Sequence, residues 1–170
     1  MSGHVRIVND PIELVPLIVT FNQPKFKEIY DLLNKNWLTE EDLCRQADPE
    51  VVCDCLAILK KGNLIEEQWR MPKPGDKPVK EYRTTYGKFR ASFQCSMSDL
   101  GDLLHIAVSK NDQLRRLADQ IQEEINKGNT SINDLGRKLS CSPTMIKGLA
   151  KRVPQLDVKG QSLILIERNE

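Results

Sequence analysis

The sequence lacks the long apolar run of a membrane-spanning helix, since no stretch approaches ~20 consecutive apolar residues. The opening segment, Met1–Pro11, has no apolar core of the kind found in secretory signal peptides, so we expect a cytoplasmic protein. An excess of one charge is also missing, because 25 basic residues meet 24 acidic ones and the net charge is +1. Binding to a polyanion would therefore depend on a local basic patch rather than on the field of the whole protein.

Motifs of common catalytic and cofactor sites are absent too. The chain has no glycine-rich phosphate loop, no nucleophile elbow and no paired acids, and its two histidines, His4 and His105, lie far apart. Its five cysteines show neither a CxxC motif nor Cys/His spacing typical of metal ligands, and free thiols are the simplest interpretation. We therefore expect no enzyme activity, no cofactor and no metal site. A thiol or metal switch built from these cysteines stays open as an alternative hypothesis.

A strongly marked helix is predicted over Asp48–Lys61. Apolar residues recur along it at the spacing of one helix face. Asp48 can cap its start, and Pro49 occupies the first helical position, where a missing N–H costs nothing. Gly62 and Asn63 tolerate the left-handed conformation in which helices often end. The apolar face consists of Val52, Cys55, Leu56 and Leu59.

The segments around this helix complete a recognisable order. Upstream, a helix is expected over Pro24–Asn36 with an apolar stripe of Phe26, Ile29, Tyr30 and Leu33. Thr39 with Asp42 forms a capping box that starts a second helix. Downstream, two strands are predicted over "LIEEQWRM" and "VKEYRTTY", joined by the proline-rich tip "PKPGDKP". Helix, turn, helix and two-stranded ribbon is the order of a winged helix-turn-helix unit.

The same order recurs after a further helix predicted over Ser98–Ser109, whose apolar side is expected to be Leu100, Leu103, Leu104 and Ala107. A periodic helix over Gln113–Lys127 precedes two short helices, the first capped by Thr130 or Ser131 and the second by Ser142, and two strand-like runs then flank Gly160. We predict a mainly α fold with small β-hairpin wings, an α+β class built from tandem winged helix-turn-helix units. The expected domains are an N-terminal winged-helix domain over 1–95, a linking or dimerisation helix over 96–110 and a C-terminal winged-helix-like domain over 111–170.

The N-terminal lead-in is less regular. Alternation over Val5–Val8 predicts a short strand, and Asn9–Phe21 is apolar but interrupted by Pro11 and Pro16. We expect this lead-in to pack on the first domain.

The segments "VCDCLAILKKGNLIEEQWRMPKPGDKP", "KEYRTTY" and "FQCSMSDL" resemble those of archaeal transcriptional regulators of the ArsR type, and the resemblance covers nearly the whole chain. The helix-to-ribbon segment is similar to the family pattern "xxxHLxxLxxxGLI", whereas the proline-basic ribbon and the C-terminal unit are more particular to an archaeal subgroup. The resemblance implies a DNA-binding regulator that forms a homodimer. It also implies that Asp48–Lys61 is the recognition helix and that Leu64–Tyr86 is the wing.

Metal sensing is not carried over from the family. Metal-sensing members hold a Cys-x-Cys pair in the helix before the recognition helix, whereas Cys53 and Cys55 lie within the predicted recognition helix itself. Two residues that are two apart on a helix point roughly 200° apart, so both thiols cannot easily hold one ion. The preceding helix offers only Cys44.

The predicted wing is the most basic segment and the best candidate for contact with double-stranded DNA, because basic side chains neutralise phosphates. A solvated hairpin without a ligand is the alternative. Glu50 and Asp54 make the first recognition helix acidic, which opposes DNA docking and keeps open a protein–protein interaction adaptor that binds no DNA. The expected wing contacts are Arg70, Lys73, Lys77, Lys80 and Arg83, with Lys88 and Arg90 in the same basic segment.

The second unit has the opposite charge on its third helix. Its expected DNA contacts are Thr144, Lys147, Lys151 and Arg152, which should project from the helix. The alternative there is a solvent-exposed basic face that binds no ligand. The helices over Ser98–Ser109 and Gln113–Lys127 could pair across a two-fold axis, or their apolar stripes could close the core within one chain.

Overall fold

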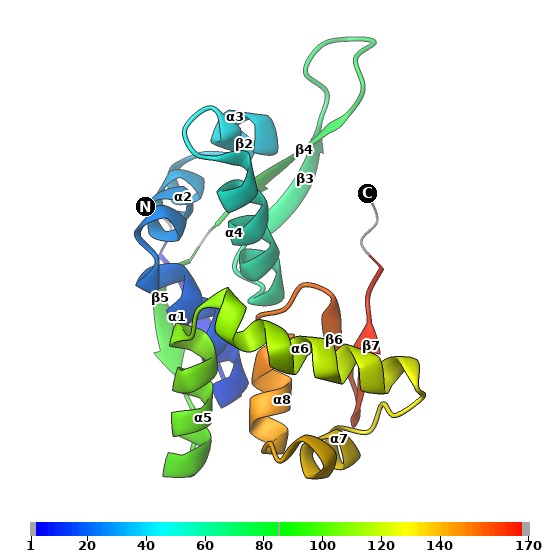
Figure 1. Ribbon diagram of the computed structural model, residues 1–170. Helices are drawn as coiled ribbons and strands as arrows, with labels where there is room; N and C mark the ends of the chain where they lie inside the picture. Colours follow the sequence, from blue (N-terminus) through cyan, green and yellow to red (C-terminus); the bar gives the residue numbers. More distant parts are fainter. Residues whose placement is uncertain (1–2, 85, 168–170) are drawn as a thin grey trace. The chain divides into compact units, whose positions relative to one another are not determined.

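The computed structural model describes residues 3–84 and 86–167 (Figure 1). Its chain forms two compact units, and each is described by itself. The first unit takes the residues up to Val8 and Thr20–Ser92, and the second takes Asn9–Val19 and the residues from Phe93 onward. Helices account for about 52% of the chain and strands for about 20% in small sheets, which confirms the predicted α+β class.

The first unit contains three helices, α2 (Pro24–Lys35), α3 (Glu40–Cys44) and α4 (Pro49–Lys61). The capping box predicted before α3 is confirmed, because Thr39 Oγ1 accepts from Asp42 N at 3.1 Å and Asp42 Oδ2 accepts from Thr39 N at 3.1 Å. The apolar faces predicted for α2 and α4 are also confirmed. Their buried members are Phe26, Ile29, Tyr30, Leu33, Val52, Cys55, Leu56, Ile58 and Leu59.

The first unit contains an antiparallel sheet beside these helices. Its strand order is β2 (Leu38–Thr39), β4 (Val79–Arg83) and β3 (Glu66–Arg70), and Trp69 on β3 lies opposite Lys80 on β4. The left-handed conformation after α4 falls on Asn63, with φ of 51°, whereas Gly62 stays right-handed. The first unit also holds a two-stranded parallel sheet of β1 (His4–Val8) and β5 (Tyr86–Ala91). The predicted strand over Val5–Val8 is confirmed, but its pairing was not foreseen because parallel partners leave no local signal.

The second unit begins with the 3₁₀ helix η1 (Pro11–Glu13) and most of α1 (Leu14–Asn22). Four helices follow, namely α5 (Met97–Val108), α6 (Asn111–Asn126), α7 (Ile132–Leu139) and α8 (Pro143–Ala150). The antiparallel hairpin of β6 (Leu156–Lys159) and β7 (Ser162–Leu165) turns at Gly160, as expected, and Ser131 makes an isolated antiparallel bridge to Ser162. The buried core contains Leu103, Ile106, Ile121, Ile132, Leu135, Ile146, Leu149, Leu156 and Leu163.

Residues 9–19 correct one expectation. They cluster with the second unit, where η1 contacts α5 and α8, and not with the first domain as we predicted. Pro11 and Pro16 do not break this segment, since each lies in the first turn of a helix, where the backbone N–H groups have no intrahelical partner to lose. Prolines that we interpreted as breaks therefore mark helix starts.

The faces of α5 correct a second expectation. Leu103 and Ala107 are buried as predicted, but Leu104, which we placed on the same side, is 42% exposed. Ile106 fills the core instead. Leu104 and Ile106 are two positions apart and point about 160° apart around the helix, and on α5 the core lies on the side of Ile106.

Candidate nucleic-acid interface

The outer surface of α4 begins with acidic residues. Asp48 caps the helix by accepting from Glu50 N at 2.9 Å, and the side chain of Glu50 is exposed. Cys53 follows on the exposed side, whereas Cys55 is fully buried, so the two thiols point apart as expected. The start of α4 therefore presents negative charge, and positive charge appears only at its end, with Lys60 and Lys61.

One face of the β3–β4 hairpin is tied to the end of α4. The carboxylate of Glu67 on β3 lies 3.0 Å from Nζ of Lys60 on α4 and 3.0 Å from Nζ of Lys80 on β4. Each lysine also lies over an aromatic ring, Lys60 over Tyr82 at 4.9 Å and Lys80 over Trp69 at 5.4 Å. Burial alone would raise the pKa of Glu67, but the hydrogen bonds from the two lysines outweigh it and lower that pKa. This lysine–glutamate cluster fixes the hairpin against the helix.

The opposite face of the hairpin is organised by Glu81. This carboxylate is buried on the central strand, where it accepts from Gln68 Nε2 at 2.5 Å and pairs with Arg70 at 3.3 Å. Arg83, on the same strand, is half-buried, and its buried Nε has no hydrogen-bond partner within residues 3–84 and 86–167. Arg70 and Lys80 are thus held by ion pairs within the hairpin, which the cross-strand register decides and the sequence pattern did not reveal.

The tip of the hairpin is different. Figure 1 shows it extending beyond α3 and α4. Lys73 and Lys77 are exposed there, and neither forms an ion pair with any residue that the structure describes. Gly75 adopts φ of 92°, a conformation that side chains rarely tolerate, and Asp76 N donates to Lys73 O at 3.1 Å to close the turn. Of the predicted wing residues, these two lysines are the ones with charge available to a ligand.

Helix α8, the third helix of the predicted winged-helix domain over 111–170, begins as predicted. Ser142 accepts from Met145 N at 3.0 Å and donates its hydroxyl to Asp102 Oδ2 at 2.5 Å. Thr144 and Lys147 are half-buried near this start, and Lys151 follows at the helix end. All three side chains are half-buried, and their contact with DNA stays a prediction.

Arg152 corrects the expectation that it projects from the helix. It is buried, and its guanidinium donates to the carbonyls of Ile106 and Ala107 at the end of α5 and to Asn111 Oδ1 at 3.0 Å. Burial also lowers the pKa of this guanidinium. The carbonyls at a helix end need donors from outside the helix, and Arg152 supplies them, so it serves the core of the second unit.

Three other basic residues of the second unit form ion pairs with acidic residues of the same unit. Lys138 on α7 lies 2.7 Å from Glu124 Oε2, and Lys127 lies 3.5 Å from the other oxygen of this carboxylate. The hydrogen bonds from Lys138 and Asn129 lower the pKa of Glu124. Arg137 is exposed and pairs loosely with Asp134 at 3.5 Å.

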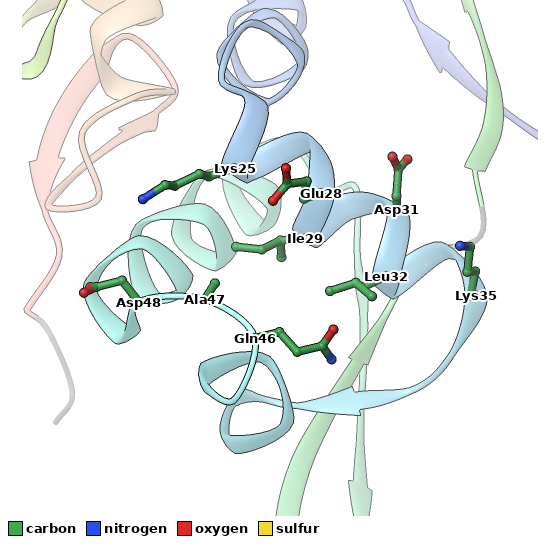
Figure 2. A pocket seen from close by; sticks show the side chains of 9 residues that line it. All are labelled: Lys25, Glu28, Ile29, Asp31, Leu32, Lys35, Gln46, Ala47 and Asp48. Carbon is green, nitrogen blue, oxygen red and sulfur yellow. The ribbon is translucent and has the colours of Figure 1, made fainter.

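A cleft of about 510 Å³ lies between α2 and the turn that joins α3 to α4 (Figure 2). Ile29 and Leu32 line its floor, and its rim carries both signs of charge, with Lys25 and Lys35 beside Glu28 and Asp31. Such a mixed rim favours neither an anionic nor a cationic ligand, and we assign it none.

Across the described part of the chain, no group of three or more His, Cys, Asp or Glu residues is placed to hold a metal ion. Within the same residues, no helix combines the length and the apolar character that crossing a bilayer requires.

Three helices followed by a cation-tipped hairpin form an arrangement typical of DNA-binding proteins of the helix-turn-helix class. Comparison with protein families agrees with this class, because the model of the ArsR transcriptional regulator matches residues 8–167. The chain belongs to the ArsR family of transcriptional regulators, whose members are regulators and not enzymes. No curated protein matches the chain.

Proposed function

We propose that this transcriptional regulator binds double-stranded DNA with the β3–β4 hairpin as its wing and α3–α4 as its helix-turn-helix. The observation that carries the proposal is the hairpin tip, where Lys73 and Lys77 are exposed and without an ion pair among the described residues. Family membership supports it, since ArsR regulators bind DNA. Such a protein would act in the cytoplasm, where it meets the DNA that it regulates.

The charges of the hairpin divide into two roles in this proposal. Lys73 and Lys77 neutralise phosphates and anchor the wing. Arg70 and Lys80 share their charge with Glu81 and Glu67, so they maintain the shape of the hairpin and contribute less to DNA affinity. Arg83 is half-buried and contributes least. The acidic start of α4 is repelled by phosphates, which makes the tip the main anchor.

The second unit supports a tandem winged-helix organisation. Its order of α6, α7, α8 and hairpin repeats that of α2, α3, α4 and hairpin. The bridge from Ser131 to Ser162 also stands where β2 pairs with β4 in the first unit. We therefore retain the two winged-helix domains over 1–95 and 111–170 and the linking helix over 96–110, except that residues 9–19 are assigned to the second domain and not to the first. Thr144, Lys147 and Lys151 are the proposed DNA contacts of the second domain, and the similarity to an archaeal subgroup stays a prediction.

A homodimer completes the proposal, and α5 supplies its contact face. Met97, Gly101, Leu104 and Val108 share one side of this helix and are exposed. A Cβ at Gly101 would meet no atom within 4 Å, so a second helix can approach closely there. A second copy of the chain is the occupant that fits, because two-fold dimers match palindromic operators.

The test is a salt titration of duplex DNA binding. The double variant Lys73→Ala/Lys77→Ala should weaken binding at every sequence and reduce the slope of log K against log salt by about 2, because each phosphate contact contributes about 0.9. The matched control is Lys25→Ala/Lys35→Ala, which removes two exposed lysines of α2 and should leave the slope unchanged. An unchanged slope in the tip variant would remove the wing from the proposal.

The acidic surface around Asp48 and Glu50 favours one second candidate, a protein–protein adaptor that docks a basic partner. The same titration separates the two functions. An adaptor without DNA affinity would show no binding even at low salt, where phosphate contacts are strongest.

A further inference from the structure

The largest exposed apolar side chains of the hairpin lie beside its cationic tip. Trp69 is 67% exposed and Met71 is 61% exposed. Trp69 lies in β3 and Met71 directly follows its last residue, so the alternation of the strand, continued by one residue, places both on one face of the hairpin. Neither side chain belongs to the buried core of the first unit, to which Ile65 and Tyr82 contribute near the strands. Two large apolar side chains exposed next to each other form a patch of the kind that can serve as a contact surface.

The indole of Trp69 is held in a defined orientation. Lys80 lies over the ring, with Nζ 5.4 Å from its centroid, and Glu67 holds the same Nζ at 3.0 Å. Glu67 is itself held by Lys60 of α4. One side of the ring therefore faces a fixed cation, and the rest of its surface faces solvent. A side chain oriented in advance loses little conformational freedom on binding.

The charged residues around Trp69 and Met71 indicate which kind of ligand this surface would bind. Lys73 and Lys77 follow within the tip, and three prolines, Pro72, Pro74 and Pro78, restrict its backbone. An apolar surface next to two available cations is complementary to the wall of a DNA groove, where sugars and base edges lie between two rows of phosphates. Methionine and proline are among the side chains that proteins insert between base steps from the minor groove.

We propose that Trp69 and Met71 form an apolar wedge that packs into the minor groove of double-stranded DNA while Lys73 and Lys77 contact the flanking phosphates. This inference rests on the proposed DNA-binding function and assigns a distinct, non-electrostatic contact to the same hairpin. The lysines set the salt dependence of binding, and the wedge adds affinity that salt does not screen.

The experiment uses fluorescence of the full chain carrying Trp37→Phe, since the sequence contains two tryptophans and Trp69 then reports alone. An AT-rich 20-base-pair duplex is the probe. Its binding should quench the emission of Trp69 and shield the ring from acrylamide, and netropsin, which fills the minor groove, should abolish both effects. Retention of both effects with netropsin bound would overturn the minor-groove assignment.

Affinity measurements complete the test. Trp69→Ala/Met71→Ala should bind the duplex about tenfold more weakly, with an unchanged salt slope, as expected for the loss of one aromatic contact with a base or sugar. Phe89→Ala, which removes another exposed aromatic outside the hairpin, is the matched control and should bind normally. Wild-type affinity in the double variant, or unaltered Trp69 emission on a bound duplex, would overturn the wedge and leave DNA binding intact. Absence of any duplex binding at low salt would instead overturn the proposed function itself.

Discussion

Glu67 on β3 lies 3.0 Å from the ammonium group of Lys60 on α4, and this contact joins the candidate recognition helix to the hairpin that follows it. The same carboxylate holds Lys80 on the neighbouring strand. The hairpin tip therefore leaves the first unit in a direction that the ion cluster helps to set. Loss of the cluster should affect both the stability of the unit and the placement of the tip.

The first prediction concerns the pH dependence of stability. The folded state lowers the pKa of Glu67, so its contribution is present above the ordinary value of 4.5 and is lost as the pH falls through the lower folded value. Glu67→Gln should remove at most about 1 kcal/mol at pH 7, because the cluster is partly exposed. Urea unfolding from pH 7 to pH 3 should show wild type and variant converging at low pH. A constant difference across this range would contradict the assignment.

The second prediction compares two glycines. A Cβ at Gly136 on α7 would lie 2.8 Å from the carbonyl oxygen of Cys141, a backbone atom that cannot move away easily. Gly136→Ala should therefore destabilise the protein by about 1–3 kcal/mol. At Gly101 on α5 the same group meets nothing within 4 Å in its own chain, and in the monomer Gly101→Ala should stabilise by about 0.5–1 kcal/mol. Urea midpoints that moved in the same direction would contradict this contrast.

The third prediction concerns Arg152. Arg152→Met leaves the carbonyls of Ile106 and Ala107 without their side-chain donor and should cost about 2–4 kcal/mol of unfolding free energy. Lys147→Met, at a half-buried lysine of α8, is the control and should change stability by less than about 0.5 kcal/mol. Equal stabilities of the two variants would show that Arg152 does not support the second unit.

The fourth prediction concerns the cysteines. Cys53 and Cys95 are exposed, whereas burial raises the pKa of the Cys55 thiol to about 12. A thiol reagent that absorbs on reaction should modify Cys53 and Cys95 first at pH 8, and Cys55 only after unfolding in urea. Fast modification of Cys55 in the folded protein would revive the hypothesis of a thiol switch.

The fifth prediction concerns the dimer. Leu104→Glu/Val108→Glu places two charges on the exposed apolar face of α5 and should convert a dimer into a monomer. Ile166→Glu, an equally exposed apolar position outside α5, should leave the dimer intact. Light scattering at micromolar concentration measures both. A wild-type protein that is already monomeric there would exclude the dimer.

The residues of the site that a local sequence pattern marks could be predicted, whereas those that depend on contacts between strands could not. The tip lysines were found because Lys73 and Lys77 stand among prolines in a segment with one acid. Glu67 and Glu81 were missed as partners, because the cross-strand register that brings Glu81 to Arg70 depends on the length of the tip. An aromatic residue in a polar strand was the only signal for Trp69, and its exposure could not be read from alternation alone.

The sequence by itself determined where four of the helices begin. Thr39, Asp48, Ser131 and Ser142 cap helices as predicted, because a cap depends on residues only two or three positions away. Only the tertiary structure decided that Arg152 is buried, that residues 9–19 join the second unit, and that Lys60 meets Glu67. Each of these depends on which distant segments pack together, and burial and ion pairing are properties of that packing.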